Sequence, residues 1–170
     1  MSAATEPAQH GKSTQGSSQL SVGEATRTLT LPHLPYADAV LAALDAAGLQ
    51  PAAVEAGLRR GRTGTPELYA RAVWPAGSPA LSDAARARGL TVAWSHVTGW
   101  SAHDAEENCA LLDVDSLAAP ELVADAAQHH ARSGVDEARP WVPPAEGRWS
   151  EAVYLDIALS LFDEKDGPTW

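Results

Sequence analysis

The stretch Leu90–His103 constrains the fold of this chain more than any other. Apolar residues occupy alternate positions on both sides of Thr98-Gly99, which is the period-two pattern of strands with one buried face. Gly99 accepts the positive φ that a tight reversal requires. The stretch therefore predicts a β-hairpin whose two tryptophans, Trp94 and Trp100, each cover roughly 150–250 Å² of apolar area in a core.

Four further elements are predicted around the hairpin. A proline at the first helical position and a glycine after the last one delimit each predicted helix. Alternation of apolar residues indicates the strands. The elements are a helix over Pro35–Ala47, a strand over Glu67–Trp74, a strand over Cys109–Val114, and a helix that begins at Pro120 and that Gly134 closes.

Two other segments have weaker patterns. Pro51–Leu58 has the spacing of a short helix, with Val54 and Leu58 on one side, although Gly57 lowers its helix propensity. Residues 79–88 fit either a helix stopped by a glycine or a loop.

The order of elements predicts the fold class. A helix is followed by three or four strands and a second helix, and the connections are short enough for neighbouring strands to pair. Two helices on one face of the sheet would cover it. We therefore predict an α+β fold: a two-layer sandwich in which an antiparallel sheet of three to four strands has helices packed on one face.

The composition along the chain predicts the domain limits. Residues 1–28 are rich in Ser, Thr, Gln and Gly without periodicity, which is typical of a disordered tail. The core domain is expected over residues 29–134. After it we expect a Pro-rich linker over 135–148, an amphipathic helix over 149–163 and a tail over 164–170.

Charge and hydropathy limit the partners and the compartment. The net charge of −10 opposes binding to nucleic acid or to anionic membranes. No run approaches the roughly 18 apolar residues of a membrane span, and the first 18 residues lack the apolar segment of a signal peptide. The single cysteine, Cys109, cannot form an internal disulfide. We therefore expect a cytoplasmic protein.

A cluster of arginines departs from the acidic balance. Between residues 59 and 88 six arginines face only two acidic residues. This local excess predicts either an anion-binding surface or solvated side chains that pair with acidic groups elsewhere, and the second interpretation is favoured because surface ion pairs are common. The anion-binding candidates are Arg59, Arg60, Arg62, Arg86 and Arg88.

Three segments of the chain carry a family resemblance: Ala46-Ala47-Gly48-Leu49 at the end of the first helix, Val92–Trp100 in the hairpin, and the Pro-headed helix Pro120–Ala131. On these segments the chain resembles a domain of unknown function found mainly in actinobacteria. Ser95 and His96 stand where that pattern has acidic residues. The resemblance implies the limits of the domain and assigns no catalytic residue.

The hairpin also holds the candidate ligand site. Tryptophans and histidines could line a pocket, although core packing is the favoured role of the tryptophans. Alternation places His103 on the face opposite Trp100, and no metal-ligand spacing is present. We therefore predict no metal, no cofactor and no catalytic residue. The candidate ligand-binding residues are Trp74, Trp94, His96, Trp100 and His103.

Two further groups have simple structural interpretations. Cys109 is expected to act as a small apolar residue and not as a nucleophile. His129 and His130 lie in the last turn of a predicted helix, where a protonated imidazole interacts favourably with the helix dipole.

The C-terminal helix is the main functional candidate. Val153, Ile157 and Leu161 form one apolar line along it, and Leu155, Leu159 and Phe162 form another. Because such a wide apolar arc is unstable in water, the helix must dock on the core, on a second copy of the chain or on another protein. We therefore predict a non-enzymatic interaction module; the alternative is a small-molecule-binding or catalytic domain at the hairpin. The candidate partner-binding residues are Trp149, Val153, Ile157, Leu161 and Phe162.

Overall fold

The computed structural model describes residues 31–166, apart from the side chain of Asp166. This range contains every helix and strand predicted above. The tail predicted over residues 1–28 lies outside it, as do residues 167–170. Residues 164–166, predicted as part of a C-terminal tail, instead belong to the last helix, which ends at Asp166.

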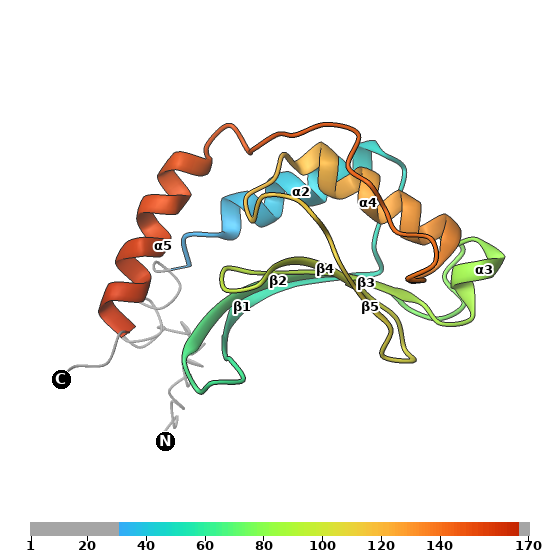
Figure 1. Cartoon of the computed structure of the whole chain (residues 1–170), viewed down its shortest axis with the longest axis horizontal. Helices are drawn as coiled ribbons and strands as arrows, with labels where there is room; N and C mark the ends of the chain where they lie inside the picture. The colour runs from blue at the N-terminus through green and yellow to red at the C-terminus, as the bar shows by residue number, and fades with distance from the viewer. Residues whose placement is uncertain (1–30, 167–170) are drawn as a thin grey trace, which may run out of the picture. The chain divides into compact units, whose positions relative to one another are not determined.

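The centre of the structure is an antiparallel sheet of five strands in the order β1-β2-β3-β4-β5. Each strand pairs only with its neighbours in the sequence, so the sheet is a meander (Figure 1). The strands are β1 (Ala53–Arg60), β2 (Pro66–Trp74), β3 (Leu90–Ser95), β4 (Gly99–His103) and β5 (Cys109–Leu111).

Helices cover one face of this sheet. The two longer covering helices, α2 (Leu34–Ala46) and α4 (Pro120–Ser133), lie above the strands in Figure 1. The short helix α3 (Asp83–Arg86) comes between β2 and β3 in the chain and lies beyond one end of the sheet, and α5 (Ala152–Asp166) lies beside the other end (Figure 1). The predicted α+β two-layer sandwich with an antiparallel sheet is confirmed, and the sheet has one strand more than its expected upper limit.

The additional strand is β1, and the prediction of a short helix over Pro51–Leu58 is wrong. Val54, Ala56 and Leu58 pair with Ala72, Ala70 and Leu68 of β2 in continuous register. Pairing with β2 satisfies the backbone hydrogen bonds along one edge of β1. A short helix interrupted by Gly57 would be less stable, because glycine has a low helix propensity.

The predicted hairpin is present with a slightly different reversal. Trp94 is paired with Trp100, and Ser95 with Gly99, so the loop consists of residues 96–98. Gly99 has a φ of 73°, the positive value expected for it, but it is the first residue of β4. The predicted strand Cys109–Val114 also exists as a shorter element, because β5 ends at Leu111.

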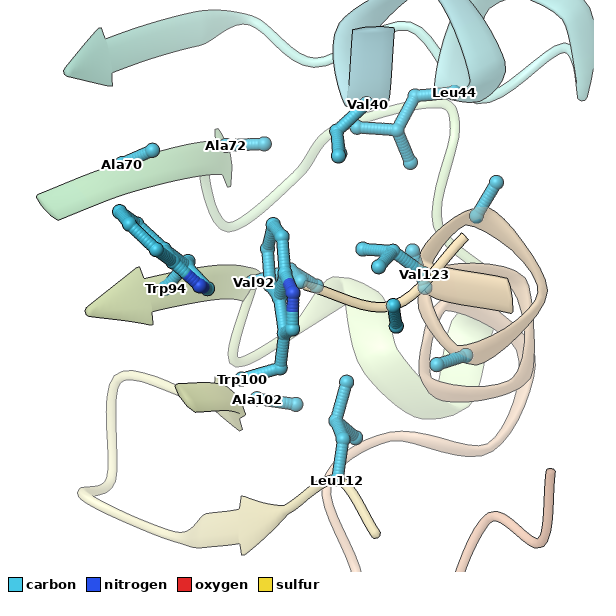
Figure 2. Packing of buried hydrophobic residues seen from close by; sticks show 14 of the residues in the cluster. Val40, Leu44, Ala70, Ala72, Val92, Trp94, Trp100, Ala102, Leu112 and Val123 are labelled. Atoms are coloured by element: carbon cyan, nitrogen blue, oxygen red, sulfur yellow. The ribbon is translucent and has the colours of Figure 1, made fainter. Parts of the chain in front are cut away.

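Tryptophans and alanines together build the core between the sheet and the helices. Figure 2 shows Val40 and Leu44 of α2 and Val123 of α4 directed toward Trp100 and its neighbours on the sheet. Ala70 and Ala72 of β2 lie opposite Trp94 and Val92 of β3 and leave room for these larger side chains. The buried residues of the sheet include Leu68, Ala70, Ala72, Trp74, Leu90, Val92, Trp94, Trp100 and Ala102.

The Pro-rich segment between α4 and α5 contains no helix or strand but is fastened to the core. Val135 is buried, and the Trp141 indole N–H donates to Asp125 Oδ2 at 2.8 Å. Closer to α5, the backbone of Arg148 forms an isolated bridge with Ala118. The segment predicted as a linker therefore holds the start of α5 close to the domain.

Candidate functional site

The three tryptophans proposed as ligand-binding residues are core residues whose indole N–H groups all have partners within the protein. Trp74 donates to the Gln50 carbonyl at 3.0 Å. Trp94 donates to the Ser116 carbonyl at 2.7 Å. The Trp100 indole donates to the Tyr36 hydroxyl at 3.1 Å, and that hydroxyl donates to the Ala118 carbonyl at 2.7 Å.

These bonds tie both tryptophans of the hairpin to the segment that leads into α4. Burial raises the pKa of Tyr36, so its hydroxyl stays protonated and keeps its donor. Trp74 is paired with Leu90 at the start of β3, whereas Trp94 lies near the end of that strand, where it is paired with Ala70. The three rings therefore do not converge on one pocket.

His96 and His103 are on different sides of the hairpin, as the alternation predicts for His103. His103 shares a 2.8 Å hydrogen bond with Ser101 on the face away from the helices. The His96 side chain instead lies at the end of the sheet, where its Nδ1 accepts a 3.0 Å bond from the Leu68 backbone N–H. The two imidazoles therefore do not form a joint site.

The bonds of His96 define its tautomer and connect α5 to the sheet. Because Nδ1 is an acceptor, the proton of the neutral ring is on Nε2, which donates to Asp163 Oδ1 of α5 at 3.1 Å. Phe162 packs its ring edge-on against His96, with the centroids 5.5 Å apart. His96 is thus a contact between the hairpin and α5.

Sequence reasoning missed a second buried histidine, His33, beside this contact. His33 stacks on the Trp94 ring at 5.6 Å and its Nε2 donates to the Tyr69 carbonyl at 2.9 Å. Its place just before Pro35, at the start of a well-delimited helix, is the only signal of it in the sequence.

Burial determines the protonation of His33 and of His130. In each ring burial lowers the pKa, a backbone carbonyl bond opposes this, and a neighbouring histidine lowers the pKa further. Burial of His130 at the end of α4 thus opposes the cationic form that a helix dipole favours. Its Nδ1 donates to the Gly134 carbonyl at 3.2 Å as a neutral ring.

These histidines predict a loss of stability on acidification. The unfolded chain takes up protons near pH 6.5, whereas the folded chain binds them only at lower pH, so the free energy of unfolding should fall as the pH drops below 6.5. Each histidine contributes at most about 1.4 kcal/mol per pH unit. Urea unfolding at pH 7 and at pH 5 measures the effect.

A double variant isolates their contribution. His33→Gln keeps a donor at the Nε2 position and His130→Asn keeps one at the Nδ1 position, and neither amide titrates. The variant should lose less stability between pH 7 and pH 5 than the natural chain. An equal loss in both proteins would assign the pH dependence to other groups. Glu67 should not add to the loss between pH 7 and pH 5. The bond from Arg59 lowers its pKa, so the stability that this carboxylate gives is lost only below about pH 4.5.

The five candidate arginines do not form one anion site. Arg59 pairs with Glu67 at 3.0 Å and Arg88 with Glu106 at 3.1 Å, on opposite ends of the sheet. Arg86 pairs with Asp83, and Arg60 donates to the Gly64 carbonyl. Arg62 is an exposed residue of the turn between β1 and β2. The candidates are thus distributed between two places, and four of them have partners nearby.

Other candidate chemistry is also limited. Cys109 is a free, exposed thiol at the start of β5, so the expectation of a small apolar core residue is wrong. Within residues 31–166, His, Cys, Asp and Glu do not gather in threes that could hold a metal ion. In the same range, none of the helices has both the length and the apolar character needed to cross a membrane.

Helix α5 docks on its own domain through one face. Ala152 and Leu155 are buried, and Leu159 and Phe162 are partly buried against the core. Arg148 bonds both Asp156 of α5, at 2.8 Å, and Asp115 of the core, at 3.0 Å. Docking in cis, which the sequence leaves open, is therefore observed.

The opposite face of α5 remains apolar and exposed. Val153, Ile157 and Leu161 are 62%, 57% and 52% exposed, and Tyr154 beside them is 75% exposed. At about 100° per residue the first three lie within roughly 80° of one another on the helix. We call these four residues the outer row of α5.

The five predicted partner-binding residues thus divide into two groups. Val153, Ile157 and Leu161 belong to the outer row. Phe162 contacts His96, and Trp149 packs on Tyr36 with ring centroids 5.1 Å apart, so these two hold α5 to the domain.

Comparison of the chain with family models, curated proteins and solved structures finds no match in any of the three. The resemblance to an actinobacterial domain of unknown function stays a prediction.

Proposed function

We propose that this protein is a non-enzymatic interaction module that presents the outer row of α5 to another protein. The observation that carries the proposal is the division of α5 into two apolar faces, of which only one is used by the domain. Neighbouring large apolar side chains in water are costly, since complete burial of one contributes roughly 1.5–3 kcal/mol, and more than half of each of the four is still exposed. A partner that covers them would recover this free energy.

The attachment of α5 makes the outer row a preformed surface. The bonds of Asp156 and Asp163 and the packing of Leu155 and Phe162 fix the helix along its length. A partner therefore binds an ordered helix and does not bear the entropy of folding it. This supports recognition by the helix-in-groove mode, with residues at i, i+4 and i+8 as anchors.

Charge indicates the chemistry of the partner. The exposed carboxylates Glu151 and Glu164 lie near the two ends of the outer row, and the chain as a whole carries −10. An apolar groove with a basic rim complements this surface, and long-range attraction would speed the encounter. We therefore propose a basic partner protein.

The experiment is site-specific photo-crosslinking in the cells that make the protein. A photoreactive residue at position 157 should capture one polypeptide that the same residue at position 142 does not, because Val142 is an exposed apolar residue outside α5, next to Trp141, which bonds to α4. The captured protein is then purified and titrated with the natural chain and with Ile157→Lys and Val142→Lys.

The expected result is an affinity at least about tenfold weaker for Ile157→Lys, equivalent to ~1.4 kcal/mol, and an unchanged affinity for Val142→Lys. Both variants should fold normally, since exposed substitutions change stability by about 0.5 kcal/mol or less. Equal binding by both variants, capture of nothing specific at position 157, or capture of the chain itself would each contradict the proposal.

A further inference from the structure

The strand β1 forms a long, regular edge of the sheet. It pairs with β2 without a bulge from Ala53 to Arg60, and in residues 31–166 no strand pairs with its other side. Proteins usually shorten, kink or cover such edges, because free backbone groups pair readily with another chain. The opposite edge, β5, is only three residues long. β1 has no such protection by length.

The register identifies the backbone groups that β1 leaves free. The Gly61 N–H donates to the Thr65 carbonyl at 2.8 Å, which continues the ladder one pair beyond Arg60 and Pro66. Antiparallel residues alternate between pairs that exchange both bonds and pairs that exchange none. Odd-numbered residues of β1 therefore bond to β2, and the N–H and C=O groups of Val54, Ala56 and Leu58 point away from the sheet.

The side chains of these three residues form an apolar row on the helix side of β1. Their partners on β2 are buried beneath the helices, whereas Val54 and Leu58 are 43% and 46% exposed. A shallow apolar groove, open to solvent, lies between Val54 and the side chains of Leu41 and Leu44 of α2. The helices thus leave the β1 margin of the sheet uncovered.

We propose that β1 pairs antiparallel with β1 of a second copy of this chain, with Gly57 of both copies on the twofold axis. In this register Glu55 lies opposite Arg59 of the second copy, and Ala56 lies opposite its Leu58. On that face Val54 lies opposite Arg60 at the two ends of the contact. The strand is therefore self-complementary in charge on one face and, at the centre of the contact, in apolar character on the other. The two sheets become one continuous sheet of ten strands.

The backbone geometry fits this register. An axis through a residue places even-numbered residues opposite even-numbered ones, so the free groups of both copies meet. Gly57 and the Glu55–Arg59 pairs then occupy non-hydrogen-bonded positions, where Cα atoms approach to about 4.5 Å and side chains are closest. In the single copy Glu55 and Arg59 also pair with Arg71 and Glu67, so the new contacts join existing ion pairs.

The mass of the full chain in solution, measured by light scattering over a concentration series, tests the association. We expect a dimer whose dissociation constant rises about tenfold or more in Leu58→Lys, since a charge replaces an apolar contact of the interface. Leu111→Lys is the matched control, because Leu111 is an exposed leucine on the opposite edge strand. Ala56→Pro removes a donor that the single copy does not use and should also dissociate the dimer.

Disulfide trapping tests the register. In a Cys109→Ser background, which removes the only cysteine, Gly57→Cys should form a cross-linked dimer under mild oxidation. A Cβ at Gly57 lies 3.6 Å from the Tyr69 ring, an ordinary contact, so the substitution fits the fold. Cross-linking by Ala56→Cys instead would place the axis at Ala56 and overturn the proposed register.

The outcomes separate this surface from the outer row of α5. A chain that is monomeric at all concentrations, or a dimer that Leu58→Lys and Ala56→Pro leave intact, would overturn pairing through β1. A dimer that is lost only in Ile157→Lys would assign self-association to α5, which overturns both this inference and the choice of a different partner protein for that helix.

Discussion

Replacing Trp94 with alanine is expected to lower the free energy of unfolding by about 3–5 kcal/mol, the range found for buried tryptophan and phenylalanine. Trp94 is almost fully buried at the centre of the hairpin. Its ring stacks on His33 and meets the edge of Tyr36 at 5.9 Å, so its removal leaves a cavity between β3 and α2. It also leaves the Ser116 carbonyl without its donor.

Urea unfolding followed by circular dichroism measures this loss. Trp94→Phe is an intermediate change, because it keeps a six-membered aromatic ring in the core but removes the N–H and the five-membered ring; it should cost less than alanine, about 1–3 kcal/mol. Trp141→Ala is the control, since Trp141 is only partly buried and bonds to an exposed carboxylate. A loss below about 1 kcal/mol for Trp94→Ala would mean that this ring does not organise the core.

Replacing Gly89 with alanine is expected to cost about 2–5 kcal/mol, from a strained φ and from overpacking. Gly89 ends the α3 segment with a φ of 71°. A Cβ there would lie 2.8 Å from the Trp74 carbonyl oxygen and 2.9 Å from the Ala76 nitrogen. Both are backbone atoms, so the start of β3 must move away from the end of β2.

Gly77→Ala distinguishes the cost of a positive φ from the cost of a steric clash with the backbone. Gly77 has a similar φ of 84°, but a Cβ there would have no neighbour within 4 Å. Alanine at Gly77 should therefore cost only the left-handed conformation, about 1–2 kcal/mol. Thermal unfolding of both variants measures the difference, and equal losses at the two sites would show that the close approach to Trp74 has no energetic weight.

The local patterns of the sequence predict most of the fold. The hairpin, the strand that ends at Trp74 and the helices headed by Pro35 and Pro120 are all present because each has a clear period and a clear stop. The helix predicted around Val54 and Leu58 is wrong for a definable reason. A spacing of four residues places two side chains on one face of a helix and also on one face of a strand, so only pairing with β2 distinguishes the two.

The candidate site is less accessible to sequence reasoning. The two apolar lines of α5 can be predicted from the sequence. Which of them packs on the domain depends on residues distant in the sequence, such as His96, which bonds Asp163, and Asp115, which bonds Arg148. The buried role of His33 depends in the same way on Tyr69 and Trp94. Such contacts are made by the tertiary fold and leave no local period.

The meander order of the sheet has a consequence for how the chain folds. Residues 61–65, 96–98 and 104–108 are the only chain between three of the four strand pairs, and the fourth pair is joined by residues 75–89. Closing loops this short costs little entropy, so the sheet can assemble by successive local steps. The packing of the helices on the sheet and on one another, by contrast, requires distant parts of the chain to meet, as in the bonds of Tyr36 to Ala118 and of His96 to Asp163.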